Sequence, residues 1–286
     1  MKIKGLLDDN DTNGGLTSIT NREYEQQELS VEYIQPWSNF ICKIKLPDKV
    51  FVDLQKLYDE ASKLNISFGK ELVGQVDDEP QVTPELQSKF QNFTTFCLHS
   101  VRQYVTVAMG QALKGDNKGD EVEKFFKEDA PNLLTRITTM WFVNQKPGEY
   151  NPAHIHTNCK VSAVMYLRKP SRQIKGRKDH YESDGMITFM NNTGTDLTFA
   201  NAQCSFNPEP GDMYIFPALQ HHMVWPYRSE DPNDSRISLS FNADFTTKSR
   251  LEKEQEHQEM MFKEMKKMKE SENDKSVTDG NINKSG

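Results

Sequence analysis

The stretch GEYNPAHIHTNCKVSAVMYL, residues 148–167, holds the pattern that decides the fold. Its last part, residues 161–167, is a largely apolar run with the length of a buried strand. His154 and His156 stand just ahead of that run. Because side chains at positions i and i+2 of a strand share a face, the two imidazoles can point at one metal ion. The two histidines of a HxH pair are more often polar side chains exposed to solvent than metal ligands, so a metal site needs a third ligand from elsewhere in the chain.

A third ligand is available in EPGDMYIFPALQHHMVWP, residues 209–226, where His221 and His222 follow an apolar strand that ends at Phe-Pro. A histidine on a neighbouring strand can meet a HxH pair at the mouth of a small barrel, where alternate side chains point inward. Further along, Arg236 and Ser238 are again two positions apart and share a face. The planar guanidinium of Arg236 suits the carboxylate of a small acid. Together these residues favour a metal site over a pair of solvent-exposed histidines.

Short strands dominate the chain from Leu133 onward, each bounded by Gly, Pro, Asn or Asp. The predicted strands cover residues 133–145, 159–169, 185–192, 196–206, 212–218 and 235–245. Upstream, apolar positions with helical spacing predict one helix over residues 47–64 and one longer helix over residues 83–109, which Thr83 caps. This order predicts a mainly β fold with N-terminal helices (α+β), namely a β-sandwich or jelly roll buttressed by helices on one face.

The chain is expected to form one domain with appendages. Its regions are a flexible N-terminal segment (1–30), a helical support region (31–130), a β core (131–247) and a charged helix with a disordered tail (248–286). The spacing of Met261, Met265 and Met268 is compatible with a partner-binding stripe. We favour a plain surface helix packed loosely on the domain.

Composition excludes several classes of protein. The net charge of −7, with no stripe of Lys and Arg among aromatics, argues against a nucleic-acid partner. No apolar run has the length of a membrane span, and the N-terminus turns acidic before a secretory signal could form. We therefore expect no membrane partner and a cytoplasmic protein. The four cysteines (Cys42, Cys97, Cys159 and Cys204) lack a CxxC pair, so buried free thiols are expected.

Six sequence elements occur in a recognisable order between Trp141 and Asn242. They are Gly148, Tyr150, His154 and His156; Met165-Tyr166-Leu167; Gly185 to Phe189; Pro210-Gly211 to Phe216-Pro217; His222 to Pro226; and Arg236 to Ser238. In this order they resemble the iron(II)- and 2-oxoglutarate-dependent oxygenases. The closest resemblance is to the prolyl-hydroxylase-like members of bacteria and marine tailed phages.

The resemblance implies a double-stranded β-helix whose catalytic residues are His154, His156, His222 and Arg236. Iron(II) would be held by His154, the residue at position 156, and His222; the motif spacing selects His222 rather than His221. Arg236, with Ser238 and the hydroxyl of Tyr166, would anchor the distal carboxylate of 2-oxoglutarate. O2 is the implied oxidant, and ascorbate is a further candidate cofactor.

The departure from the family pattern is His156, because most of the superfamily has a carboxylate there. Loss of that negative charge should weaken metal retention. Three histidines are the favoured ligand set. The alternative is a carboxylate from Glu149 or Asp184, with only one histidine of the pair ligating.

The resemblance also implies an activity. The expected reaction is hydroxylation of a C–H bond, with release of succinate and CO2. The substrate would be a protein or peptide of prolyl type, or a small molecule, and a phage-encoded enzyme would act in the host cytoplasm. The basic loop 169–185, with Arg172, Lys175, Arg177 and Lys178, is expected to select an acidic or extended substrate. The oligomeric state stays open.

Other functions stay open beside this one. The spacing of Gly148 to His156 also fits a cupin-type metalloenzyme that needs no 2-oxoglutarate, although the glutamate that cupins carry after HxH is missing at Lys160 and Val161. A zinc site completed by Cys159 would leave Arg236 without a role. A non-catalytic jelly-roll binding module or phage structural module would need none of the histidines.

Overall fold

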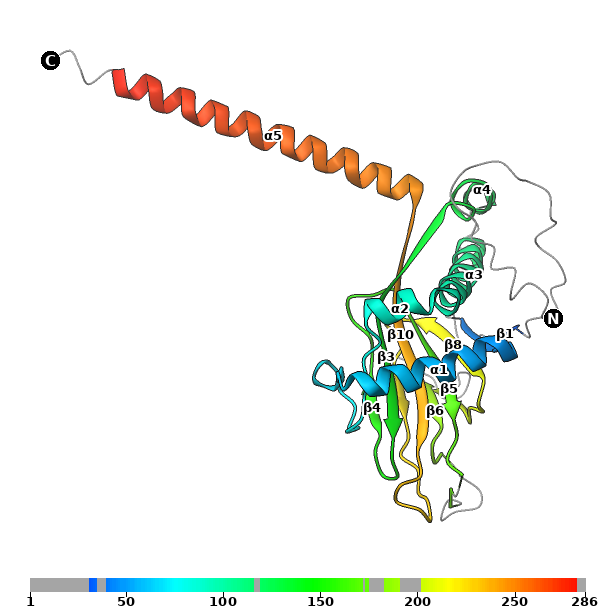
Figure 1. Cartoon of the computed structure of the whole chain (residues 1–286). Coiled ribbons are helices and arrows are strands. Elements are labelled where there is room, and N and C mark those ends of the chain that lie inside the picture. The colour runs from blue at the N-terminus through cyan, green and yellow to red at the C-terminus, as the bar shows by residue number, and fades with distance from the viewer. Residues whose placement is uncertain are drawn as a thin grey trace.

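The computed structural model describes residues 31–34, 40–115, 119–171, 173–174, 183–190 and 202–281 of the chain. Two antiparallel β-sheets face each other, and helix α1 (Asp48–Leu64) lies across the outer face of the larger one (Figure 1). The whole of the expected flexible segment, residues 1–30, lies outside the described residues.

The larger sheet has the strand order β1-β2-β8-β5-β10-β3, and the smaller has the order β4-β9-β6-β7. The strands of the larger sheet are β1 (Val31–Ile34), β2 (Ile41–Lys45), β3 (Leu133–Gln145), β5 (Val161–Arg168), β8 (Asp212–Pro217) and β10 (Arg236–Thr247). Those of the smaller sheet are β4 (Asn151–His154), β6 (Ile187–Met190), β7 (Gln203–Phe206) and β9 (His222–Val224). From β3 to β10 the two sheets share eight strands, four each, in the arrangement of a double-stranded β-helix. The expected fold class is therefore confirmed.

Strand alternation divides the interior into two parts. Along β10, Ile237, Leu239, Phe241 and Ala243 point into the core between the larger sheet and the helices. The intervening residues Arg236, Ser238, Ser240 and Asn242 point toward the smaller sheet. One face of the larger sheet therefore supports the fold, and the other is free to form a site.

The helices cover the outer face through apolar stripes. In α1 the buried residues are Val50, Leu54, Leu57 and Ala61, and the helix ends at Asn65 in the left-handed conformation. The expectation of a single helix over residues 83–109 is wrong. The segment forms two helices, α2 (Pro84–Lys89) and α3 (Gln91–Gly115), because Phe90 leaves the helical conformation with φ −103° and ψ 47°. Two short helical segments follow, α4 (Gly119–Lys124) and the π-helical turn η2 (Phe125–Asp129), and a 3-10 turn η1 (Gly69–Glu71) lies between α1 and α2.

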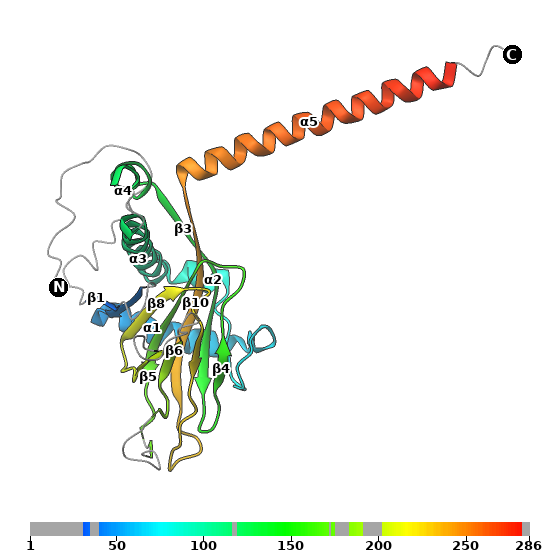
Figure 2. The ribbon, with the colours of Figure 1, turned by 180° about the vertical axis from the view of Figure 1, so that it is seen from behind.

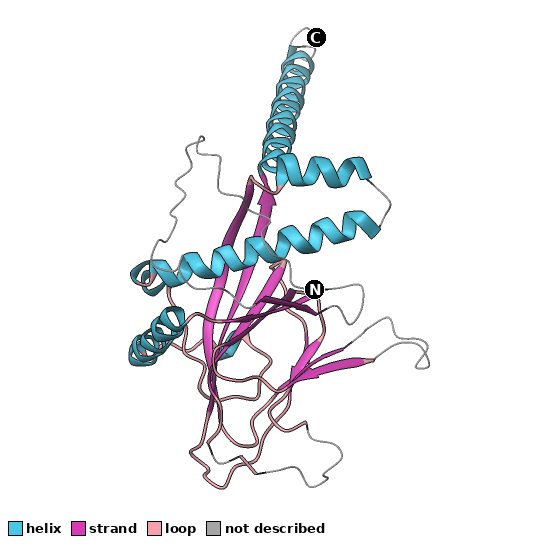
Figure 3. Ribbon diagram, turned by 90° about the vertical axis from the view of Figure 1, so that its right-hand side faces the viewer, coloured by secondary structure: helices cyan, strands magenta, loops and turns pink. Residues whose placement is uncertain are grey.

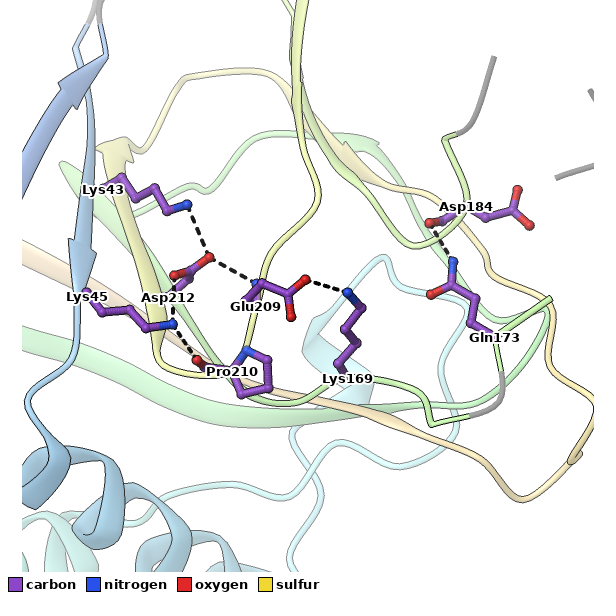
Figure 4. Close-up of polar contacts among 8 residues, drawn as sticks. All are labelled: Lys43, Lys45, Lys169, Gln173, Asp184, Glu209, Pro210 and Asp212. Atoms are coloured by element: carbon purple, nitrogen blue, oxygen red, sulfur yellow. Dashed lines mark hydrogen bonds and ion pairs between the residues drawn. The ribbon is translucent and has the colours of Figure 1, made fainter. Parts of the chain in front are cut away.

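The turn at Gly211 and Asp212 holds the start of β8, the strand that precedes His222. Gly211 has φ +84°, which glycine adopts without strain, and the next residue, Asp212, is buried. The Asp212 carboxylate lies 3.2 Å from the Nζ atoms of both Lys43 and Lys45 and accepts a hydrogen bond from the backbone N–H of Glu209 (Figure 4). These contacts tie β8 to β2.

The C-terminal helix α5 (Lys248–Asn281) leaves the end of β10 and projects away from both sheets (Figures 2 and 3). The sequence suggested a helix resting loosely on the domain and then a disordered tail, whereas one helix continues to Asn281. Met261 and Met265 are exposed on it. Its many Glu, Lys and Met residues are strong helix formers, which explains its length. Within the described part of the chain, no helix combines the length and apolar character that crossing a membrane requires.

Candidate functional site

A cavity of about 910 Å³ lies between the two sheets. The larger sheet contributes inward-facing residues of β3, β5, β8 and β10, and the smaller sheet contributes residues of β4, β6 and β9. Residues 67–74, in the connection between α1 and α2, form a further part of the wall. Every site residue expected from the sequence (Tyr166, His154, His156, His222, Arg236 and Ser238) lines this one cavity.

The three histidines converge in the cavity. Their nearest ring nitrogens all lie within 4.8 Å of one another. His154 ends β4 and pairs with His222, which begins β9, so their ring centroids are 4.3 Å apart. The expectation that His154 and His156 share one strand is wrong, because β4 ends at His154. His156 is held instead by its backbone N–H, which donates to the carbonyl of Ala218 at 2.9 Å.

Hydrogen bonds orient two of the rings. Nδ1 of His154 lies 2.6 Å from the carbonyl of Pro152, and Nδ1 of His222 lies 2.9 Å from that of Gln220. Because a carbonyl only accepts, each Nδ1 carries the proton, which leaves Nε2 of each ring with a free lone pair. This is the usual arrangement of a metal-ligating histidine.

The surroundings keep the imidazoles neutral. Burial, together with the neighbouring His154, lowers the pKa of His156 to about 4. Burial and the two other histidines hold the pKa of His222 well below its ordinary value, and burial also lowers that of His154. Neutral imidazole is the form that binds a metal ion.

Arg236 lies buried beside the histidine cluster. Its terminal nitrogens donate to the carbonyl of Gly185 and to Oε1 of Gln145, but its Nε has no hydrogen-bond partner. The hydroxyl of Tyr166 is likewise buried without a partner, and the guanidinium lies 5.7 Å from the Tyr166 ring centroid. Ser238 pairs with Tyr166 across β10 and β5, which brings the three side chains together. Two unsatisfied donors in one place fit an oxygen-rich anion.

No carboxylate takes part in the cluster. Among the described residues, the His, Cys, Asp and Glu side chains that lie close enough together to hold a metal ion are His154, His156 and His222. Glu149 accepts hydrogen bonds from the backbone N–H groups of Lys146 and Asp77, and Asp184 pairs with Arg228 at 2.9 Å. Cys159 is also absent from the cluster, so the zinc alternative gains no ligand. The donor set is therefore three neutral nitrogens, which suits a divalent transition metal.

Two residues of the site were missed by sequence reasoning. Gln145, at the end of β3, is fully buried and supplies the oxygen that holds Arg236. Glu79 lines the cavity, is buried, and has a pKa raised to about 7 by burial and by the nearby Glu149 and Asp78. Neither belongs to a motif, and only the strand pairing brings them to the site.

Most of the expected substrate-selecting loop cannot be placed at the site. Arg172, Lys175, Arg177 and Lys178 lie outside the described residues. At the base of the loop, Gln173 donates from Nε2 to the carbonyl of Asp184 at 3.0 Å (Figure 4).

Comparison with known proteins finds a match within the β core. Residues 139–242 match the model of a family described as putative 2OG-Fe(II) oxygenases. No curated protein matches the chain. Among solved structures, a prolyl-4-hydroxylase of Pseudomonas putida is 16% identical, covers 70% of this chain and 89% of its own, and has a TM-score of 0.40. A prolyl hydroxylase of Trichoplax adhaerens, solved with a hypoxia inducible factor peptide, is 13% identical, covers 71% and 83%, and has a TM-score of 0.44. A Burkholderia pseudomallei oxidoreductase of the 2OG-Fe(II) oxygenase family is 14% identical, covers 72% and 84%, and has a TM-score of 0.39.

Proposed function

We propose that this chain, whose residues 139–242 belong to the superfamily of iron(II)- and 2-oxoglutarate-dependent oxygenases, is a dioxygenase that hydroxylates a C–H bond. One observation carries the proposal: three neutral imidazoles and a buried, incompletely bonded arginine face the same cavity. The substrate would be a protein or peptide of prolyl type, or a small molecule. We include a cytoplasmic location in the proposal, which cell fractionation would check.

His154, His156 and His222 would hold the iron through ring nitrogens, with Nε2 facing the ion at His154 and His222. When bound, Fe(II) with 2-oxoglutarate and O2 supplies the oxidising chemistry, which releases succinate and CO2. Ascorbate would serve as a reductant that keeps the iron in the ferrous state. The histidines bring no negative charge to the ion, so iron should be retained less tightly than by a site with a carboxylate.

Arg236 would bind the distal carboxylate of 2-oxoglutarate. Its Nε and the Tyr166 hydroxyl are the two unsatisfied donors, and Ser238 adds a third hydroxyl-bearing position on the same face. Hydrogen bonds between a guanidinium and a carboxylate are about twice as strong as neutral ones. The apolar residues Val164, Ile187 and Val224 line the cavity around these donors and limit the access of water.

The proposal is tested by anaerobic titration of the purified protein with Fe(II) and 2-oxoglutarate, observing the weak visible metal-to-ligand band. The expected result is a band that needs both components, is weakened in Arg236→Ala and is unchanged in Arg136→Ala. Arg136 is a matched control because its guanidinium is exposed and pairs with Asp244, and it does not line the cavity. A band unaffected by Arg236→Ala would contradict the assigned role of Arg236.

The absence of a carboxylate from the histidine cluster of the described residues favours one second candidate, a cupin-type three-histidine metalloenzyme. That enzyme would bind metal but need no 2-oxoglutarate. Metal binding without the band and without succinate formation would therefore support it. If no metal binds at all, the non-catalytic jelly-roll module becomes the better explanation.

A further inference from the structure

Strand geometry directs the Glu79 side chain to the cavity. Residues 78–82 run along the free edge of β3, where the carbonyls of Asp78 and Pro80 accept from the backbone N–H groups of Asn144 and Phe142 at 2.9 and 2.8 Å. Val82 of this segment packs into the core on the helix side of the sheet. Glu79, an odd number of positions away, faces the opposite side and lines the cavity.

The Glu79 carboxyl is buried and unsatisfied. Its relative exposure is 1%, and neither oxygen has a hydrogen-bond partner. The two acidic residues whose charges act on Glu79 already have hydrogen-bond donors. Asp78 accepts from Nδ2 of Asn144 at 2.7 Å, and Glu149 accepts from backbone N–H groups. A buried carboxyl without partners costs free energy that the fold does not recover. Such a group is therefore explained best by a ligand that supplies the missing partner.

The buried arginine and the buried glutamate of the cavity are separated by β3. Arg236 stands on β10, which pairs with one edge of β3, whereas Glu79 stands in the segment along the other edge. Trp141 stands on the cavity face of β3, and its ring is 5.9 Å from that of His156 and 5.2 Å from that of Phe68. A substrate beside the histidines therefore has an acidic group and two aromatic faces within the same wall. Both features favour a cation.

We infer that Glu79 recognises a positively charged group of the substrate, a guanidinium or an ammonium. The inference rests on the proposed function, because it names the substrate class of the same cavity. A guanidinium would donate to both carboxylate oxygens, and the desolvated surroundings strengthen such a pair.

Glycines let a loop cover this carboxyl. A Cβ atom at Gly69 would lie 2.9 Å from Oε2 of Glu79, and one at Gly74 would lie 3.3 Å from Oε1. The backbone at Gly69 and at Gly74 therefore lies close to the carboxyl. Binding of a cation therefore requires this loop to shift or the Glu79 side chain to rotate.

The experiment compares two probes, N-acetyl-prolyl-arginine amide and N-acetyl-prolyl-citrulline amide, which differ in charge at nearly constant shape. Binding to the full chain is measured by calorimetry under anaerobic conditions, with and without Fe(II) and 2-oxoglutarate. The arginine probe is expected to bind at least about tenfold more tightly, the effect of one hydrogen-bonded charge. In Glu79→Gln the preference should vanish while the affinity for the citrulline probe stays unchanged. Because neither oxygen of Glu79 has a partner, the substitution breaks no hydrogen bond of the fold.

Glu71→Gln is the matched control, since Glu71 is an exposed acid of the same loop and also lines the cavity. It should keep the preference. Equal binding of the two probes, no binding of either, or a preference that survives Glu79→Gln would overturn the inference. The readout needs no turnover, so a failure here is distinct from the absence of the iron and 2-oxoglutarate band, which would count against the proposed function.

Discussion

At the residue scale, Gln145 shows how the site is held. Its Oε1 accepts from Arg236, and its Nε2 donates to the carbonyls of Glu149 and Trp225. The hydroxyl of Tyr227 in turn donates to the backbone carbonyl of Gln145 at 2.9 Å. Gln145 therefore acts as a positioning residue, which fixes the guanidinium without lining the cavity itself.

We predict that Gln145→Ala raises the 2-oxoglutarate concentration for half-saturation of the visible band by about tenfold or more, the effect of one lost hydrogen bond to a charged group. Metal binding without 2-oxoglutarate should stay as in the wild type, because the hydrogen bonds of the Gln145 side chain go to Arg236, Glu149 and Trp225 and to none of the histidines. The two binding curves are measured in parallel by titration. A loss of metal affinity equal to the loss of 2-oxoglutarate affinity would show general unfolding instead.

A second prediction at this scale concerns stability and pH. The pKa of Glu79 is raised from 4.5 to about 7 by burial, Glu149 and Asp78. The folded protein therefore keeps a proton that the unfolded chain releases near pH 4.5, and wild-type stability should fall as pH rises from about 4.5 to 7. Glu79→Gln removes this loss. Urea unfolding should find the variant more stable by about 3 kcal/mol at pH 8 and nearly equal at pH 4.5. A constant difference at both pH values would contradict the assignment.

At the scale of elements, the sequence predicts those helices and strands whose residue pattern is determined locally. Strand β3 was predicted with its observed bounds, Leu133–Gln145, because a long run of β-branched and aromatic residues determines it locally. Strands β4 and β9 have four and three residues, too few to show a period, so their bounds were not predicted, although the histidines were expected on neighbouring strands. The break at Phe90 also left no signal, since the apolar stripe of α3 continues that of α2.

The candidate site, too, was predictable only in part. Motif order predicted that His154, His156, His222 and Arg236 would meet, and they line one cavity. How they meet was not predictable, since His156 depends on a backbone contact with Ala218, far away in sequence. Gln145 and Glu79 depend on which strand edges pair. Long-range pairing is information that a single sequence does not display.

At the scale of the whole molecule, three parts have separate tasks. The helices pack on one face of the larger sheet, and the cavity opens on its other face. The third part, α5, starts where β10 ends, at the end of that strand away from Arg236 (Figure 1). No described residue after Thr247 lines the cavity. The C-terminal helix should therefore contribute neither to the core nor to the site.

We predict that removal of residues 248–286 leaves the melting temperature within about 2 °C of the full chain, because the exposed residues of α5 bury little apolar surface. The band with Fe(II) and 2-oxoglutarate should keep its intensity and its half-saturation concentrations. Scanning calorimetry and the anaerobic titration test the two parts independently. A fall in melting temperature with an unchanged band would mean that α5 stabilises the end of β10. A weaker band at an unchanged melting temperature would instead mean that α5 acts on the site, which the separation of the three parts does not allow.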